Sequence, residues 1–248
     1  MDSLPAPVIT QESILSALTE GEIDLQGQFV WGSNSTFLVN VVTPDLTLPA
    51  IYKPSKGERP LWDFPAASLA RREVCAFLVS QALGWQLVPP TVYRRKGPFG
   101  KGSLQLFIPH DPNRHYFSLT DAEKESLKVV ACFDLLINNA DRKGSHILWD
   151  EEGHLWAIDH GICFHREYKL RTVIWDFIGQ PIPAESLTSI QSLLLPALGE
   201  PGDPNGLLHE WLLPSEVNAL RRRAIRLLEE GVFPPPLGKD RPYPYPPL

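Results

Sequence analysis

Residues 138–164 read N-N-A-D-R-K-G-S-H-I-L-W-D-E-E-G-H-L-W-A-I-D-H-G-I-C-F, and this stretch is more informative about function than the rest of the chain. Asp141 lies in a short polar loop after an apolar helical run, and Asp159 lies in a turn between a strand and a glycine. The residues between them predict a hairpin. A hairpin with one carboxylate before it and one after it can present both carboxylates on opposite sides of a cleft.

The two aspartates fit the chemistry of phosphoryl transfer. Moving a γ-phosphoryl group needs little covalent help, so the protein must hold a metal on the phosphates and orient the attacking hydroxyl. Two facing carboxylates can divide those tasks. Aspartate oxygens also suit magnesium, which draws further ligands from the nucleotide. Either aspartate taken alone is better explained as a turn residue, because Asp side chains readily bond to nearby backbone.

Two motifs in this stretch resemble a known family. D-R with a polar run and I-L at residues 141–148, followed by A-I-D-H-G at residues 157–161, looks like the catalytic loop and metal-binding turn of phosphatidylinositol 3-/4-kinases and their bacterial relatives. The family pattern is D-R-x-x-x-N followed by I-D-x-G. The resemblance implies that Asp141 orients or deprotonates the acceptor hydroxyl and that Asp159 is the metal ligand.

The rest of the chain extends this resemblance over roughly residues 25–177. The segments Y-K-P-S-K-G-E-R-P-L-W-D-F-P and L-G-W-Q-L-V-P-P-T-V are similar to those of short bacterial proteins that are described only by their kinase likeness. The resemblance implies an α+β, bilobal kinase-like fold that binds ATP with Mg²⁺ or Mn²⁺.

One position departs from the family pattern. Five residues after Asp141, where the pattern has a metal-binding asparagine, stands His146. Imidazole is a poor ligand for magnesium and a better one for manganese or zinc. His146 therefore binds a softer metal, or donates to a phosphate, or marks the loss of a second metal site. Asn138 and Asn139 are alternative sources of an amide oxygen.

The N-terminal part supplies candidate phosphate-binding residues. Two runs, residues 25–31 and 36–42, predict strands. The turn between them consists of Gly32, Ser33, Asn34 and Ser35. Backbone N–H groups and short hydroxyl side chains in such a turn can receive phosphate oxygens. Because the turn has one glycine, an ordinary hairpin turn is the competing interpretation.

Lys53 and Glu73 are candidates for a nucleotide-binding ion pair. A short strand, residues 50–53, ends in Lys53. Kinases place a lysine there to contact the α- and β-phosphates, and a glutamate from the following helix holds it. Apolar residues at helical spacing predict that helix over residues 66–84, with Glu73 in its middle. The order of elements favours this pair over two unrelated surface charges.

Two further strands are predicted at residues 88–94 and 102–109, with a glycine-containing turn between them. The resemblance implies that the second strand leads into the hinge of a bilobal kinase. Backbone groups near Gln105 and Phe107 would there contact the edge of adenine. Phe107 is equally well explained as a core residue.

From Thr120 onward the pattern is helical. Thr120 and Glu123 form a capping box, and the helix that follows delivers the chain to Asp141. Two later helices are predicted at residues 184–198 and 215–231. The tail, residues 234–248, contains too much proline to fold alone. We therefore expect four parts: an N-terminal segment with a short helix (1–24), a nucleotide-binding lobe (25–109), a C-terminal lobe (110–233) and the tail (234–248).

Composition limits the possible partners. The 248 residues, 43% hydrophobic, can form one large core or two lobes. A net charge of -6 speaks against nucleic acid as the main partner. We expect no membrane insertion, because no apolar run is long enough to span a bilayer. Three scattered cysteines and an N-terminus without signal-peptide character predict a cytoplasmic location.

The sequence therefore predicts an ATP-dependent phosphotransferase that acts on a protein or small-molecule hydroxyl. Two other function classes compete with it. His146, His160, Cys163 and His165 lie close in sequence and could surround a metal in a hydrolase, although only H-G-I-C resembles a zinc spacing. A pseudokinase that only binds nucleotide is the other alternative, and the histidine at position 146 is its best support.

Overall fold

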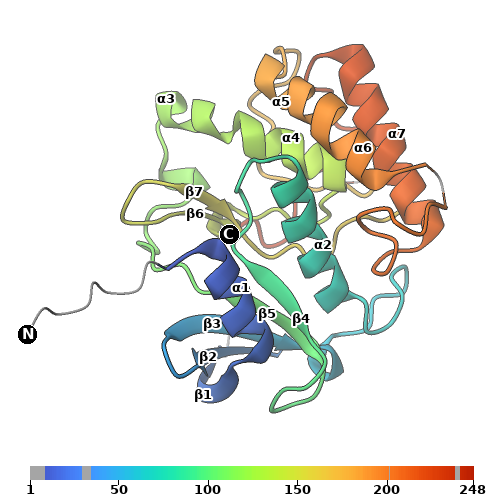
Figure 1. Ribbon diagram of the computed structural model, residues 1–248. Coiled ribbons are helices and arrows are strands. Elements are labelled where there is room, and N and C mark those ends of the chain that lie inside the picture. The colour runs from blue at the N-terminus through green and yellow to red at the C-terminus, as the bar shows by residue number, and fades with distance from the viewer. Residues whose placement is uncertain (1–8, 30–34, 201, 238–240) are drawn as a thin grey trace, which may run out of the picture. The chain divides into compact units, whose positions relative to one another are not determined.

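The computed structural model describes residues 9–29, 35–200, 202–237 and 241–248 (Figure 1). The chain divides into two compact units. The first combines residues Met1–Arg59 with Pro90–Phe107, and the second combines Pro60–Pro89 with Ile108–Leu248. Strands dominate the described part of the first unit and helices that of the second, so the predicted α+β class is confirmed.

The first unit is built on a five-stranded antiparallel sheet with the order β1-β2-β3-β5-β4. Its strands are β1 Glu22–Phe29, β2 Thr36–Val42, β3 Thr47–Pro54, β4 Thr91–Arg94 and β5 Gly102–Leu106. The predicted strands agree with these bounds to within a few residues. Helix α1 (Gln11–Glu20) precedes the sheet and begins at Thr10, whose side chain accepts a hydrogen bond from the N–H of Ser13.

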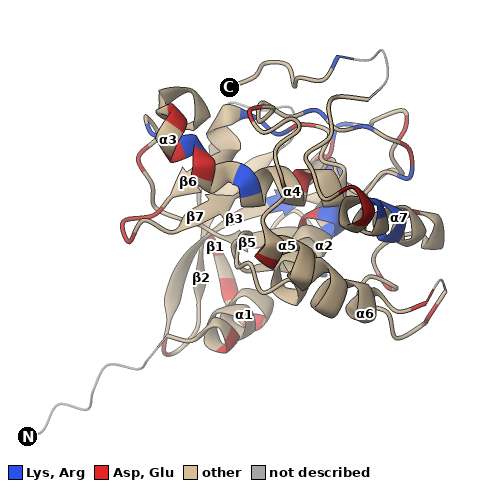
Figure 2. Ribbon diagram, turned by 90° about the horizontal axis from the view of Figure 1, so that it is seen from above, with Lys and Arg blue, Asp and Glu red and all other residues tan. Residues whose placement is uncertain are grey.

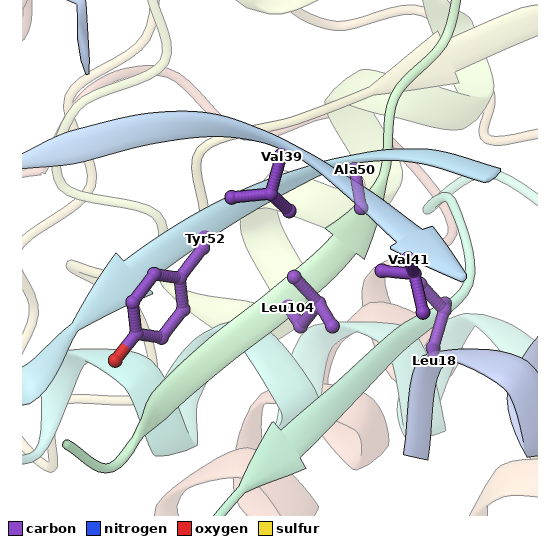
Figure 3. Close-up of a cluster of buried hydrophobic side chains, with 6 residues drawn as sticks. All are labelled: Leu18, Val39, Val41, Ala50, Tyr52 and Leu104. Atoms are coloured by element: carbon purple, nitrogen blue, oxygen red, sulfur yellow. The ribbon is translucent and has the colours of Figure 1, made fainter. Parts of the chain in front are cut away.

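One face of this sheet carries the core of the unit. Alternate residues of the strands point to opposite faces, and those on the core face are aliphatic or aromatic. Helix α1 adds Leu18 to them (Figure 3). The cluster consists of Leu18, Val39, Val41, Ala50, Tyr52 and Leu104. Because Tyr52 is buried on this face, its neighbour Lys53 points to the opposite face of the sheet.

The second unit begins with α2 (Leu69–Ala82), which is buried over most of its length. The helix predicted over residues 66–84 is therefore confirmed, although it begins later and ends earlier than predicted. Glu73 lies in this helix and so belongs to the second unit, together with the C-terminal part of the chain. The sequence predicts this helix as part of the N-terminal lobe, whereas in the structure it belongs to the second unit.

The capping box predicted at Thr120 is present. The Thr120 hydroxyl accepts a hydrogen bond from the N–H of Glu123, and the Glu123 carboxylate accepts one from the N–H of Thr120. After the short helix α3 (Asp121–Lys124) and a 3-10 turn, α4 (Lys128–Ile137) follows with mostly buried residues. The hairpin then forms from β6 (Ile147–Trp149) and β7 (Leu155–Ala157).

Three helices complete the second unit. Helix α5 (Ala184–Ser189) continues through a π-helical turn (Ile190–Leu194) into α6 (Leu195–Leu198), so the predicted helix 184–198 is present with a change of pitch. Helix α7 (Pro214–Glu230) ends at Gly231, whose φ of 64° is a conformation that glycine adopts readily. Among the residues covered by the structure, no helix is both long and apolar enough to cross a membrane.

Candidate active site

The end of α4 sets the path of the loop that contains Asp141. Asn138 takes the left-handed conformation with φ 56°, which ends the helix. Its side-chain amide donates to the carbonyls of His165 and Glu167 and accepts from the N–H of Lys169 at 2.9 Å. Asn138 therefore ties the helix end to a segment 30 residues later, and its amide oxygen already holds a backbone donor.

Asn139 fixes Asp141 directly. Its side-chain oxygen accepts from the N–H of Asp141 at 3.0 Å, and its side-chain nitrogen donates to Asp134 at 2.9 Å. Asn139 is completely buried. Both Asn138 and Asn139 therefore hold the loop in shape, and each amide oxygen accepts a backbone hydrogen bond; the metal contact considered from the sequence remains a prediction.

Arg142 is the buried centre of the site. Its guanidinium contacts both carboxylate oxygens of Asp134 at 3.0–3.2 Å, and neither side chain is exposed. It also donates to the carbonyls of His146 at 3.1 Å and Ile158 at 2.9 Å. A single charged group thus joins α4, the loop around Asp141 (residues 138–146, here the Asp141 loop) and the turn around Asp159 (residues 157–161, here the Asp159 turn).

The carboxylate of Asp141 is mostly enclosed. Its side chain is 27% exposed, and the ammonium of Lys143 lies 3.4 Å from its Oδ2. Burial raises the pKa of Asp141 to about 6, while Lys143 works against that shift and the charge of Asp159 adds to it. The Asp141 and Asp159 side chains are therefore close enough to interact electrostatically.

Asp159 is held in a different way. Its φ of 60° is left-handed, an unusual conformation for a residue with a side chain. Its carboxylate is 45% exposed, and its Oδ2 lies 3.2 Å from Nε2 of His146. The two residues predicted as metal ligands are therefore direct neighbours. The N–H of Lys143 lies 3.5 Å from the other ring nitrogen of His146.

Glu73 reaches the Asp159 turn through the backbone. Its Oε2 accepts a hydrogen bond from the N–H of His160 at 2.9 Å, and both residues are buried. On the other side, Nε2 of the His160 ring lies 2.7 Å from Arg142. Because an arginine side chain can only donate hydrogen bonds, Nε2 of His160 is the acceptor here, and the imidazole ring is therefore neutral. Glu73 and Arg142 together hold the turn from two sides.

The residues considered as a zinc site have other neighbours. The His165 ring lies 3.1 Å from the carbonyl of Asp63, and the Cys163 thiol is buried, which raises its pKa well above the usual value. His160 contacts Arg142 instead. Within the described part of the chain, no three His, Cys, Asp or Glu side chains gather to hold a metal. The hydrolase alternative thus lacks the cluster it requires.

The predicted nucleotide-binding residues lie in the first unit. Lys53 is paired in register with Ser103 and Ile51 with Gln105, so Lys53 and Gln105 share a face of the sheet. The Gln105 side chain donates to Thr91 at 2.8 Å, and the N–H of Phe107 donates to the carbonyl of Pro49 at 3.0 Å. The adenine contacts expected there remain a prediction.

The predicted phosphate loop is described only in part. Gly32, Ser33 and Asn34 lie outside the described residues. The N–H of Ser35 lies 3.4 Å from the carbonyl of Gly57. The role of this turn in holding phosphates also remains a prediction.

Sequence reasoning missed the contribution of Asp134. The signal was a lone acid in an otherwise apolar helical run, because an acid at such a position is rarely buried without a cationic partner. It also missed residues 171–173, which pair with the Asp141 loop: the N–H of Arg142 donates to the carbonyl of Arg171 at 2.9 Å, and the N–H of Val173 to that of Arg142 at 3.1 Å. No local pattern marks that pairing.

Relatives with similar sequences place these motifs in a family. The profile described as phosphatidylinositol 3- and 4-kinase matches residues 75–212. Protein Rv2133c of Mycobacterium tuberculosis is 40% identical and covers 93% of this chain and 94% of its own length. Phosphatidylinositol 4-kinase gamma 4 of Arabidopsis thaliana is 30% identical over 66% of this chain, and the match spans only 33% of the plant protein.

Solved structures with the same fold are kinases. A crystal structure of the Golgi casein kinase has a TM-score of 0.54 at 15% sequence identity, covering 88% of this chain and 74% of that one. A second structure of that kinase, with Mn/ADP bound, has the same TM-score at 16% identity. At this identity the likeness establishes a kinase-like fold. The profile match over more than half of the residues shows that the chain belongs to the phosphatidylinositol 3- and 4-kinase family.

Proposed function

We propose that the chain transfers the γ-phosphoryl group of ATP to a hydroxyl group of a protein or small molecule. The observation that carries this proposal is the joining of the Asp141 loop and the Asp159 turn by Arg142. That arrangement keeps two carboxylates within electrostatic reach of each other, one enclosed and one accessible. Phosphoryl transfer requires such a division between orienting the acceptor and holding a metal.

In this proposal Asp141 receives the proton of the acceptor hydroxyl. With a pKa raised to about 6, it is ionised at neutral pH and is a stronger base than an ordinary aspartate. The ammonium of Lys143, 3.4 Å away, places positive charge beside the position where the transferred group becomes negative. Both features favour transfer over simple nucleotide binding.

Asp159 would hold a divalent cation with the nucleotide phosphates. Its 45% exposed carboxylate is an oxygen ligand of the kind Mg²⁺ and Mn²⁺ prefer, and phosphates and water would complete the coordination. The neighbouring His146 adds a nitrogen ligand better suited to Mn²⁺. When bound, the cation neutralises charge on the phosphates. The Mn/ADP found with the Golgi casein kinase is consistent with this combination.

Lys53, Gln105 and Phe107 in the first unit, with the turn Gly32 to Ser35, would bind the nucleotide. Lys53 would contact the α- and β-phosphates, and Glu73 is its proposed partner. Glu73 already accepts from the backbone of the Asp159 turn, so in this role it would link phosphate binding to the metal ligand.

A pseudokinase is the second candidate. The observation that favours it is the 3.2 Å contact between His146 and Asp159, because a ring N–H that donates to Asp159 satisfies the carboxylate without a metal. The two candidates differ in turnover rather than in nucleotide binding.

The test is a transfer assay with γ-labelled ATP on the wild-type chain and on Asp141→Asn. Acceptors should include the chain itself, phosphatidylinositol vesicles, a protein mixture and small polyols. Label transfer that needs Asp141 supports the proposal. Metal-dependent ATP binding without transfer to any class would favour the pseudokinase. Lys53→Met, which should weaken ATP binding without unfolding the chain, serves as the nucleotide control.

A further inference from the structure

The proline-rich segment Arg241–Leu248 lies against the Asp141 loop. The carbonyl of Pro247 accepts a hydrogen bond from the N–H of Gly144 at 2.8 Å. The carbonyl of Pro242 accepts from the N–H of Thr172 at 3.0 Å and from the indole N–H of Trp175 at 3.3 Å. This end of the chain is marked C in Figure 2. The segment therefore contacts both the loop and the residues that pair with it.

The chemistry of the two surfaces is complementary. Four of the eight residues R-P-Y-P-Y-P-P-L are prolines, which have carbonyl acceptors but no N–H donors. The surface opposite them presents three N–H donors, from Gly144, Thr172 and Trp175. A proline-rich segment can offer carbonyl acceptors to such a surface without N–H donors of its own that need acceptors. An ordinary strand would have both kinds of group to satisfy.

These hydrogen bonds matter because two of the donors are buried. Gly144 and Thr172 are both inaccessible to solvent in the docked state. A Cβ atom on Gly144 would lie 2.8 Å from the ring of Phe117 and 3.5 Å from Leu248, so this residue is enclosed on two sides. A buried N–H that loses its acceptor carries a full desolvation penalty. Conformations of the loop without the segment are therefore disfavoured.

The contacts of the segment do not block the carboxylates. Its hydrogen bonds go to two backbone N–H groups and one indole, while the Asp141 side chain keeps 27% of its surface exposed. Gly144 lies three residues after Asp141 and two before His146. Thr172 lies between Arg171 and Val173, which both pair with Arg142. The segment is thus placed to hold the loop and not to cover it.

We propose that Gly144, Thr172 and Trp175 form a binding surface for proline-rich peptide, occupied by the chain's own segment Arg241–Leu248, and that this docking holds the Asp141 loop in its working conformation. The role of the loop in transfer rests on the proposed function; the docking itself does not. A proline-rich peptide added from outside would bind the same surface once the tethered segment has left it.

The experiment is hydrogen exchange on the full chain, read at the amides of Gly144 and Thr172. Pro244 is buried within the segment, so Pro244→Asp should undock it. Pro235→Asp is the matched control, because Pro235 is an exposed proline earlier in the tail. We expect exchange at both amides to accelerate at least tenfold in Pro244→Asp and to stay unchanged in Pro235→Asp. Trp175→Phe, a milder change, should accelerate exchange at Thr172 by a few-fold.

A peptide with the sequence of residues 241–248 should then restore protection in Pro244→Asp at millimolar concentration, since a tethered segment acts at about that effective concentration. A scrambled peptide of the same composition should not. Unchanged exchange in both Pro244→Asp and Trp175→Phe, or no rescue by the peptide, would overturn the proposal. If Pro244→Asp does not fold, Trp175→Phe decides between the outcomes, through exchange at Thr172 measured with and without the added peptide.

Activity provides an independent readout. If the chain transfers phosphate, Pro244→Asp should lower kcat with little change in ATP affinity, because the segment supports the loop, whereas the predicted nucleotide-binding residues belong to the first unit. If the wild-type chain proves inactive while exchange responds as expected, the docking stands and the proposed function fails. Failure of the docking proposal and failure of the proposed function are therefore distinguishable.

Discussion

The Asp141 loop and the Asp159 turn each carry one aspartate, yet the protein holds them in opposite ways. Asp141 is enclosed, with its N–H bonded to Asn139 and a raised pKa. Asp159 has a left-handed backbone and a carboxylate that is 45% exposed. Enclosure makes a carboxylate a better base, whereas exposure leaves it able to bind a hydrated cation. The difference indicates that similar residues were positioned for unequal tasks.

Removing each carboxylate should give the largest effects and separate the two tasks. Asp141→Asn should lower turnover by about 10²–10⁴-fold with ATP affinity nearly unchanged, the usual range for loss of a general base. Asp159→Asn, by contrast, should abolish the dependence of ATP affinity on Mg²⁺ or Mn²⁺. Calorimetry with and without metal, beside turnover, measures both. Equal losses of ATP affinity in the two variants would show that Asp141 and Asp159 do not have separate roles.

Arg142 joins the two regions, so its removal should damage both. Arg142→Met should lower the free energy of unfolding by about 3–5 kcal/mol, because it leaves the buried Asp134 carboxylate without its cationic partner. Replacing both residues, as in Arg142→Met/Asp134→Leu, should recover part of that loss. Urea denaturation is the measurement, and Arg226→Ala, at a partly exposed ion pair on α7, is the control, with an expected change below about 0.5 kcal/mol. A loss as small as the control's would contradict the central position of Arg142.

The burial of the Asp141 carboxylate should lower the free energy of unfolding at neutral pH. Its folded pKa, about 6, lies above the ordinary value of 3.8, so the folded state binds the proton more tightly and its ionisation disfavours folding. That cost is fully present above pH 6 and disappears as pH falls below 3.8. Asp141→Asn should therefore stabilise the chain by about 1–3 kcal/mol at pH 8. The gain should fade by pH 4. Thermal unfolding across this range tests the sign, and equal Tm differences at both ends would refute the electrostatic origin.

The same pKa predicts how turnover depends on pH. Because Asp141 must be ionised to receive a proton, kcat/KM should fall about tenfold for each pH unit below about 6. The residual activity of Asp141→Asn should lack that dependence. A wild-type profile that stays flat down to pH 5 would remove Asp141 from the role of base.

His146 should give the smallest effect, a change in metal preference. If His146 contributes to the metal site beside Asp159, the wild-type chain should prefer Mn²⁺ over Mg²⁺, and His146→Asn should move that preference towards Mg²⁺ by several-fold. Nucleotide affinity measured with each ion provides the comparison. An unchanged preference would leave His146 as a partner of Asp159 alone and would strengthen the pseudokinase alternative.

Much of the fold follows from local patterns in the sequence. The capping box at Thr120 is a short-range signal, and it occurs where the pattern predicted it. The contact between His146 and Asp159, which was not predicted, has a local cause as well, because a hairpin brings its two ends together. These features depend on residues close in sequence or joined by one turn.

The rest depends on contacts between distant residues, which no local pattern records. Glu73 bonds to a backbone N–H 87 residues away. The tail was expected only to lack a fold of its own, yet its carbonyls serve donors near residues 144 and 172. Sequence alone pointed to Asp141 and Asp159 but missed Asp134, and the backbone groups that these side chains serve become clear only from the tertiary arrangement.

The buried pair of Arg142 and Asp134 has a consequence for the order in which the site can come apart. Arg142 cannot lose its proton at any ordinary pH, so separating it from Asp134 leaves two charges in an apolar interior. Partial opening of the hairpin or of α4 would require that separation. We therefore expect the amides around Arg142 to exchange only through the cooperative unfolding of the second unit, as one foldon, whereas the 45% exposed carboxylate of Asp159 is reached by solvent without that unfolding.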